Sequence, residues 1–133
     1  MSYKFQRLEV YHLALDYVDK VYGLSKNLRA SERFDLKSQL ERAATSIVLN
    51  IAEGSTRQSN AEQNRFLGLA LRSYLETIAC LDIIGRQGYL PSVAVAKVSD
   101  FGHERFIKLE AFRKSLEAPV HGPQSPVKGI IHE

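Results

Sequence analysis

The chain contains the acidic and histidine side chains that a di-iron helical bundle uses as ligands. Two carboxylate-x-x-His pairs fall on the first and fourth expected helices, and the second and third helices each carry one glutamate, as in bundle proteins that hold two metal ions. In chain order these residues are Glu9 and His12, Glu53, Glu76, and Asp100 and His103. Their types suit a metal site, provided that the side chains converge.

The expected positions of these residues along the bundle axis argue against that convergence. If consecutive helices alternate in direction, Glu9 and His12 lie near the end where the second and fourth helices finish. His103 lies about fourteen residues from that end, roughly 20 Å along the axis at about 1.5 Å per residue. Glu76, on the third helix, lies similarly far from that end. The sequence therefore predicts neither a metal site nor any other cofactor.

Nucleophilic chemistry has a single candidate, Cys80, which is the only cysteine in the chain. No histidine lies at a spacing that would bring it beside Cys80, and a lone cysteine on an apolar helix face is usually a small core residue. The chain contains no glycine-rich phosphate loop and no HExxH or GxSxG motif. Glu53 and Glu76 would act as an acid–base pair only in a shared dry pocket. Their expected separation along the bundle axis argues against such a pocket. We expect a protein that is not an enzyme.

Residues 39–54 combine a helical apolar stripe with polar side chains that interrupt it. The interrupting residues are Gln39, Arg42, Asn50 and Glu53. Because charges on half-buried helix faces are usually paired, we predict a structural polar network in which Arg42 pairs with Glu76 of the following helix. Asn50 and Glu53 would lie near the turn around Gly54, where Glu53 accepts backbone N–H groups. The alternative is that these side chains contact a ligand or a partner.

Basic side chains from residue 57 onward are the remaining functional candidates. They are Arg57, Arg65, Arg72, Arg86, Lys97, Arg105, Lys108, Arg113 and Lys114. For each residue alone, a solvated helix face is the ordinary explanation, but together they can bind phosphate groups without sequence preference. No pattern of surface aromatic residues indicates base stacking, so sequence-specific recognition is not expected.

Four segments position these residues, and in each of them apolar side chains recur every three or four positions, as in amphipathic helices. We expect helices over residues 7–28, 34–56, 60–87 and 93–117. Expected N-caps are Ser31 or Asp35, Ser59 and Ser92, and Gly54 and Gly88 mark helix ends. No strand alternation occurs, and short connections predict an all-α, antiparallel up-down four-helix bundle. The first helix carries two apolar stripes, which hints at an oligomer because such a helix needs neighbours on more than one side.

Composition places these helices in one domain. A chain of 133 residues with 44% apolar and 25% charged residues can bury a single core. It lacks an apolar run long enough for a membrane span and a signal-peptide core, and its single cysteine fits a cytoplasmic protein. The net charge of +3 is only mildly basic. Residues 1–117 are expected to form the bundle, and the Pro/Gly-rich residues 118–133 a disordered tail.

The stretch of residues 39–54 resembles the signature of a known four-helix bundle family. The matching positions are Gln39, Arg42-Ala43-Ala44, Ser46-Ile47 and Asn50-Ile51-Ala52-Glu53-Gly54. Similar sequence continues on both sides, in FQRLEVYHLALDYVDKVY and FLGLALRSYLETIACLDIIGRQGYL. The family consists of proteins encoded in intervening sequences of bacterial 23S ribosomal RNA genes, and it is similar to the accessory variability proteins of diversity-generating retroelements.

This resemblance implies a homopentamer and a non-enzymatic accessory protein that binds RNA or DNA through basic surface. In a retroelement setting it would act beside a reverse transcriptase. Five copies of a chain with a net charge of +3 around one axis would produce a substantial positive field. The alternative is a protein–protein scaffold without nucleic-acid contact, whose charged surface serves solubility alone. Neither function involves a membrane.

Overall fold

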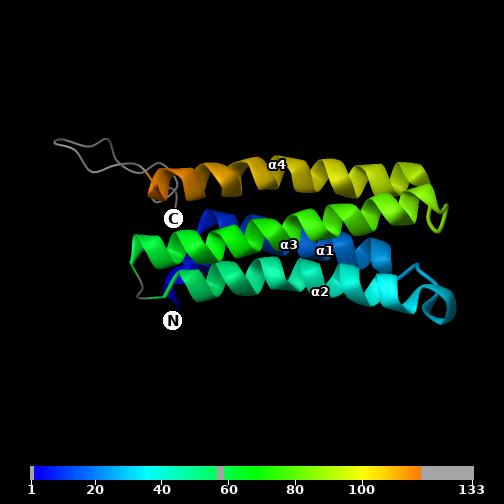
Figure 1. Ribbon diagram of the computed structural model, residues 1–133, viewed down its shortest axis with the longest axis horizontal. Coiled ribbons are helices and arrows are strands. Elements are labelled where there is room, and N and C mark those ends of the chain that lie inside the picture. The colour runs from blue at the N-terminus through cyan, green and yellow to red at the C-terminus, as the bar shows by residue number, and fades with distance from the viewer. Residues whose placement is uncertain (1, 57–58, 118–133) are drawn as a thin grey trace.

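The fold is all-helical, with four long helices and no strand among the residues that the computed structural model describes, 2–56 and 59–117. A short 3-10 helix, η1 (Lys4–Arg7), precedes α1 (Glu9–Ser25), α2 (Ala30–Gly54), α3 (Asn60–Arg86) and α4 (Ser92–Leu116). The chain runs the length of the molecule four times, with its connections at alternate ends (Figure 1). The all-α prediction is confirmed. The expected tail, residues 118–133, lies outside the described residues.

Several helix starts differ from the prediction. The first helix was expected over 7–28, but α1 is shorter, because η1 precedes it and residues 26–28 form a turn. α2 begins at Ala30 behind Arg29, so neither Ser31 nor Asp35 is its N-cap. The stretch ASER is made mostly of good helix formers, which extends the helix upstream. Ser92 is the first residue of α4 rather than its cap.

Both ends of α3 follow the prediction. The hydroxyl of Ser59 accepts the backbone N–H of Glu62, with an N···O distance of 3.3 Å, and so caps the start of the helix. At the other end Gly88 has a φ of 70°, a conformation that a side chain would strain. The backbone N–H of Tyr89 then donates to the carbonyl of Ile84 over 3.1 Å. This pattern is a Schellman motif, which satisfies carbonyl groups left free at the helix end.

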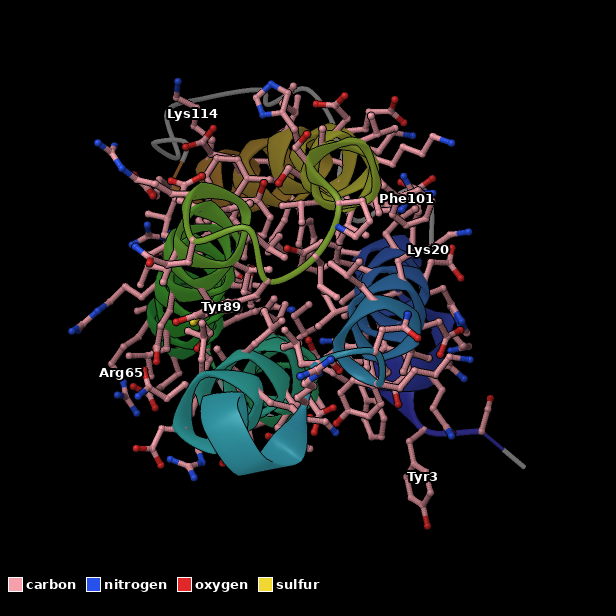
Figure 2. All side chains as sticks on the ribbon, turned by 90° about the vertical axis from the view of Figure 1, so that its right-hand side faces the viewer. Tyr3, Lys20, Arg65, Tyr89, Phe101 and Lys114 are labelled. Atoms are coloured by element: carbon pink, nitrogen blue, oxygen red, sulfur yellow. The ribbon has the colours of Figure 1, made fainter. Side chains whose placement is uncertain are left out.

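The core lies between four helices that occupy the corners of a square, with α2 diagonally opposite α4 (Figure 2). α1 and α3 each pack against both α2 and α4. Of the two apolar stripes on α1, one is buried and faces the core; it comprises Val10, Ala14, Tyr17, Val21 and Leu24. The apolar spacing of α4 predicts a buried face made of Val95, Val98, Gly102, Arg105 or Phe106, Leu109, Phe112 and Leu116. All of these are buried except Arg105 and Phe106, which are half-buried. None of the described helices combines the length and apolarity needed to cross a membrane.

Two glycines allow close approaches between helices. A Cβ atom on Gly54, the last residue of α2, would lie 2.6 Å from the Cβ of Phe66 on α3. Gly54 therefore provides space for α3, besides marking the helix end that the sequence predicted. A Cβ atom on Gly102 of α4 would lie 2.5 Å from Cε1 of Tyr17 on α1. The ring of Tyr17 has little freedom to move, since its hydroxyl lies 2.7 Å from the hydroxyl of Thr77.

Substituting Gly102 by alanine is expected to destabilise the fold by about 1–3 kcal/mol, because the new methyl group overpacks the Tyr17 contact. Gly23 is the matched control: it is also helical, but nothing lies within 4 Å of the position of its missing Cβ. Gly23→Ala should stabilise the protein by roughly 0.5–1 kcal/mol through helix propensity. Urea denaturation at fixed protein concentration measures both changes. A Gly102→Ala protein as stable as the wild type would contradict this assignment.

Candidate nucleic-acid interface

The candidate metal ligands make separate local contacts. His12 Nε2 donates to the carbonyl of Gln6 at 2.5 Å, and a carboxylate oxygen of Glu9 lies 3.9 Å from the ammonium group of Lys108. His103 is exposed on α4. In the described part of the chain, no group of three or more His, Cys, Asp or Glu side chains could hold a metal ion.

The buried titratable groups are held in their neutral forms. Cys80 is 3% exposed, and burial, reinforced by the charge of Glu76, raises the pKa of its thiol. Since the thiolate is the nucleophile, Cys80 is poorly placed to react. Burial likewise raises the pKa of the Tyr17 hydroxyl, although its hydrogen bond to Thr77 opposes the change. Thr77 donates to the carbonyl of Tyr74 over 2.6 Å, so Tyr17 must donate to Thr77. The hydrogen bond between Tyr17 and Thr77 links α1 to α3.

The polar network predicted around Arg42 is wrong in its central pair. Arg42 and Glu76 are both exposed, and Arg42 donates to the hydroxyl of Ser38, with an N···O distance of 3.1 Å. The Asn50 side chain donates to the carbonyl of Ser46 within α2, over 2.8 Å. The prediction failed because it placed Arg42 and Glu76 at a contact between α2 and α3, whereas both side chains point outward from their helices. No salt bridge links Arg42 to Glu76 in the described residues.

Three of the family-like positions, together with Leu49, instead form an exposed stripe on α2, which we call the α2 outer face. It consists of Gln39, Arg42, Leu49 and Glu53. These residues fall three, four or seven positions apart and so share one side of the helix. Leu49 is 56% exposed and is the apolar residue of this stripe. The face combines an apolar centre with charges of both signs.

Four of the predicted nucleic-acid-binding residues are engaged by carboxylates. The pairs join Arg65 to Glu62 at 3.2 Å, Arg105 to Glu104 at 3.5 Å, Lys108 to Glu9 at 3.9 Å, and Arg113 to Glu117 at 3.9 Å. A cation that already contacts a carboxylate must give up that contact, in whole or in part, before it can bind a phosphate group. These four residues are therefore weaker candidates than the sequence suggested.

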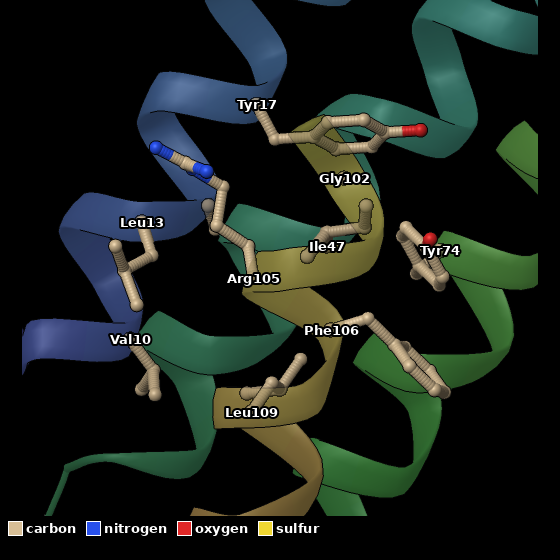
Figure 3. A pocket seen from close by; sticks show the side chains of 10 residues that line it. Val10, Leu13, Tyr17, Ile47, Tyr74, Gly102, Arg105, Phe106 and Leu109 are labelled. Carbon is tan, nitrogen blue, oxygen red and sulfur yellow. The ribbon is translucent and has the colours of Figure 1, made fainter. Parts of the chain in front are cut away.

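Arg105 is the most constrained of the four. Its guanidinium carbon lies 3.3 Å from the centre of the Phe101 ring, and Nη1 donates to the Phe101 carbonyl over 3.1 Å. Its stem runs beside Tyr17 and Gly102, along a cavity of about 20 Å³ lined mainly by apolar side chains (Figure 3). A space of that size is comparable to one water molecule and far below that of a ligand pocket. Arg105 thus packs as part of the α1–α4 contact.

The other cations predicted for nucleic-acid binding carry no salt bridge within the described residues, and we call them the unpaired cations. They are Arg72 and Arg86 on α3 and Lys97 and Lys114 on α4. All four side chains are exposed. Because α3 packs against α4, these residues belong to two neighbouring helices. Arg57 lies outside the described residues.

Sequence reasoning missed basic residues in the first part of the chain. Lys4 and Arg7 lie on η1 without a salt bridge to any described residue, and Lys20 lies over the Phe101 ring with Nζ 5.3 Å from its centre. The usable signal was the alternation of aromatic and basic side chains in YKFQR. It was overlooked because the segment precedes the helical periodicity.

Comparisons with known proteins agree with this architecture. A family model described as 23S rRNA-intervening sequence protein matches residues 6–104. A crystal structure from Bacteroides thetaiotaomicron, of a protein of unknown function from the S23 ribosomal protein family, is similar to this chain with a TM-score of 0.72 and 27% sequence identity. The similarity covers 79% of this chain and 98% of that one. No curated protein matches significantly.

Proposed function

Because the chain belongs to the 23S rRNA-intervening sequence protein family, we propose that it is a non-enzymatic, oligomeric accessory protein that binds RNA or DNA. Antiparallel up-down bundles would assemble into a cytoplasmic homopentamer, and the unpaired cations would contact phosphate groups. The proposed protein partner is a reverse transcriptase of a diversity-generating retroelement.

The observation that carries the proposal is the set of unpaired cations on α3 and α4. An exposed lysine or arginine without a carboxylate partner binds a phosphate group chiefly by releasing counterions from the nucleic acid. Arg72 and Arg86 are fourteen residues apart on α3, so they share one side of that helix over roughly 20 Å. Contacts of this type position a phosphate backbone and carry no base sequence information.

Self-assembly would multiply the weak field of one chain. The net charge of one chain is only +3, but linked copies bind a long polyanion with a high effective concentration. The α2 outer face suits assembly because α2 lies diagonally opposite α4 (Figure 2), so contacts between copies through α2 would leave α4 accessible. Its charges of both signs can pair between copies, and Leu49 can be buried between them.

The experiment that tests this function is binding of a labelled, structured RNA, followed by fluorescence anisotropy at low salt, with the mass of the protein measured in the same sample. We expect tight binding by an oligomer, and the affinity should fall by orders of magnitude between about 50 and 200 mM salt. Absence of binding at the lower salt concentration would contradict the proposal.

A protein–protein scaffold is the second candidate. The observation that favours it is a set of exposed apolar side chains on α3 and α4: Leu75, Ile83, Val93 and Ile107, each 48% to 67% exposed. Such side chains commonly mark contacts with another protein when they gather into a patch. An oligomer that fails to bind RNA at low salt would favour this candidate.

A further inference from the structure

Tyr3 is an aromatic side chain in an exposed position at the start of the described chain. Its side chain is 63% exposed and projects away from the helices (Figure 2). The Tyr3 ring is nearly parallel to that of Phe5, with an interplanar angle of 6° and 6.1 Å between ring centres. Phe5 in turn meets the edge of Tyr11 on α1, with 5.0 Å between centres. The exposed Tyr3 ring thus packs on Phe5, which in turn contacts Tyr11 of α1.

The segment that carries Tyr3 is held in place by hydrogen bonds. The backbone N–H of Tyr3 donates to the side-chain oxygen of Gln6 over 2.8 Å, and the Gln6 backbone N–H donates to the Tyr3 carbonyl over 3.0 Å. His12 holds the Gln6 carbonyl from α1, and Leu8, the residue after η1, is fully buried. Fixing the segment in advance reduces the entropy that a ligand must offset when it binds.

The groove beside Tyr3 is lined by one basic residue and by no acidic residue. Tyr3, Lys4 and Phe5 line a groove of about 440 Å³ together with Ser2 and the two residues that follow α2, residues 55–56. The volume lies in the range of small-ligand sites. Lys4 and Arg7 make no salt bridge to any described residue, so they are free to attract a phosphate group. An aromatic face beside basic side chains that have no carboxylate partner is the arrangement that binds single-stranded nucleic acid.

We infer that Tyr3 is a stacking site for an unpaired base, with Lys4 and Arg7 contacting the adjoining phosphates, so that the protein prefers nucleic acid with a single-stranded segment. This inference rests on the proposed nucleic-acid binding and adds to it the class of nucleic acid. The unpaired cations on α3 and α4 would bind duplex and single strand alike, whereas Tyr3 needs an exposed base face.

The test compares a single-stranded RNA of about 12 nucleotides with a duplex of the same length, each at low salt. Tyr3→Ala should weaken binding of the single strand about tenfold or more and leave duplex binding unchanged. Tyr3→Phe keeps the ring and should keep the wild-type affinity. Tyr22→Ala is the matched control, because Tyr22 is also exposed, at 43%, but lies near the end of α1. Crosslinking of RNA containing 4-thiouridine should identify Tyr3.

The outcomes separate this inference from the proposed function. If the wild type binds neither RNA, the proposed function fails and the inference fails with it. If the wild type binds and Tyr3→Ala binds single strand and duplex as the wild type does, only the stacking site is wrong. A Tyr3→Ala protein with a changed oligomer mass and unchanged RNA affinity would instead place Tyr3 in a contact between copies, which also overturns the inference.

Discussion

Replacing the unpaired cations Arg72, Arg86, Lys97 and Lys114 by glutamine should weaken RNA binding by about a hundredfold or more near 0.1 M salt. Each phosphate contact releases about one counterion, so the loss of several contacts compounds. The fold should be unaffected, because all four side chains are exposed and make no salt bridge within the described residues. Fluorescence anisotropy gives the affinity, and circular dichroism the helix content.

The matched control removes the same number of positive charges from residues that are already paired. Those residues are Lys37, Arg65, Lys108 and Arg113, each within 4 Å of a carboxylate. Their replacement by glutamine changes the net charge equally, and it should weaken binding much less. Equal losses in the two variants would mean that net charge alone governs binding, and the assignment of specific residues would then be wrong.

Leu49→Asp is expected to convert the oligomer into monomers of 15.0 kDa, the mass of one chain. In a single chain Leu49 is 56% exposed, so its replacement removes little buried surface. In the proposed assembly the leucine is buried between copies, and an unpaired carboxylate there would be strongly unfavourable. Light scattering after gel filtration measures the mass, and thermal melting shows whether the bundle persists.

Val93→Asp serves as the control for that substitution. Val93 is even more exposed, at 67%, and it lies in the first turn of α4, away from the α2 outer face. A carboxylate there also suits the positive end of the helix dipole. The control should keep the wild-type mass. Retention of the wild-type mass by Leu49→Asp would contradict assembly through the α2 outer face.

The fold could be predicted from the sequence because its helices are amphipathic and their ends are marked locally. The buried face of α4 was predicted except at Arg105 and Phe106, which are half-buried, and Gly88 and Ser59 fix the ends of α3 through backbone geometry and hydrogen bonding. The start of α2 was missed because the stretch ASER favours a helix as strongly as the residues after it. Propensity alone does not place such a boundary.

The candidate site was less predictable, because charge pairing depends on the relative phase of neighbouring helices. A small error in phase put Arg42 beside Glu76, whereas both side chains face outward. The pair between Glu9 and Lys108 joins helices that are distant in sequence, so nothing local indicated it. Periodicity identifies which residues are exposed, but it does not identify which exposed cations remain unpaired.

The most direct test of the central claim is the slope of log affinity against log salt concentration, measured with structured RNA for the wild type and for the variant without the unpaired cations. Each phosphate contact contributes about 0.9 to that slope. The account predicts a steep negative slope for the wild type and a slope shallower by about three or more for the variant. Parallel lines for the two proteins would contradict it, because the unpaired cations would then make no phosphate contacts.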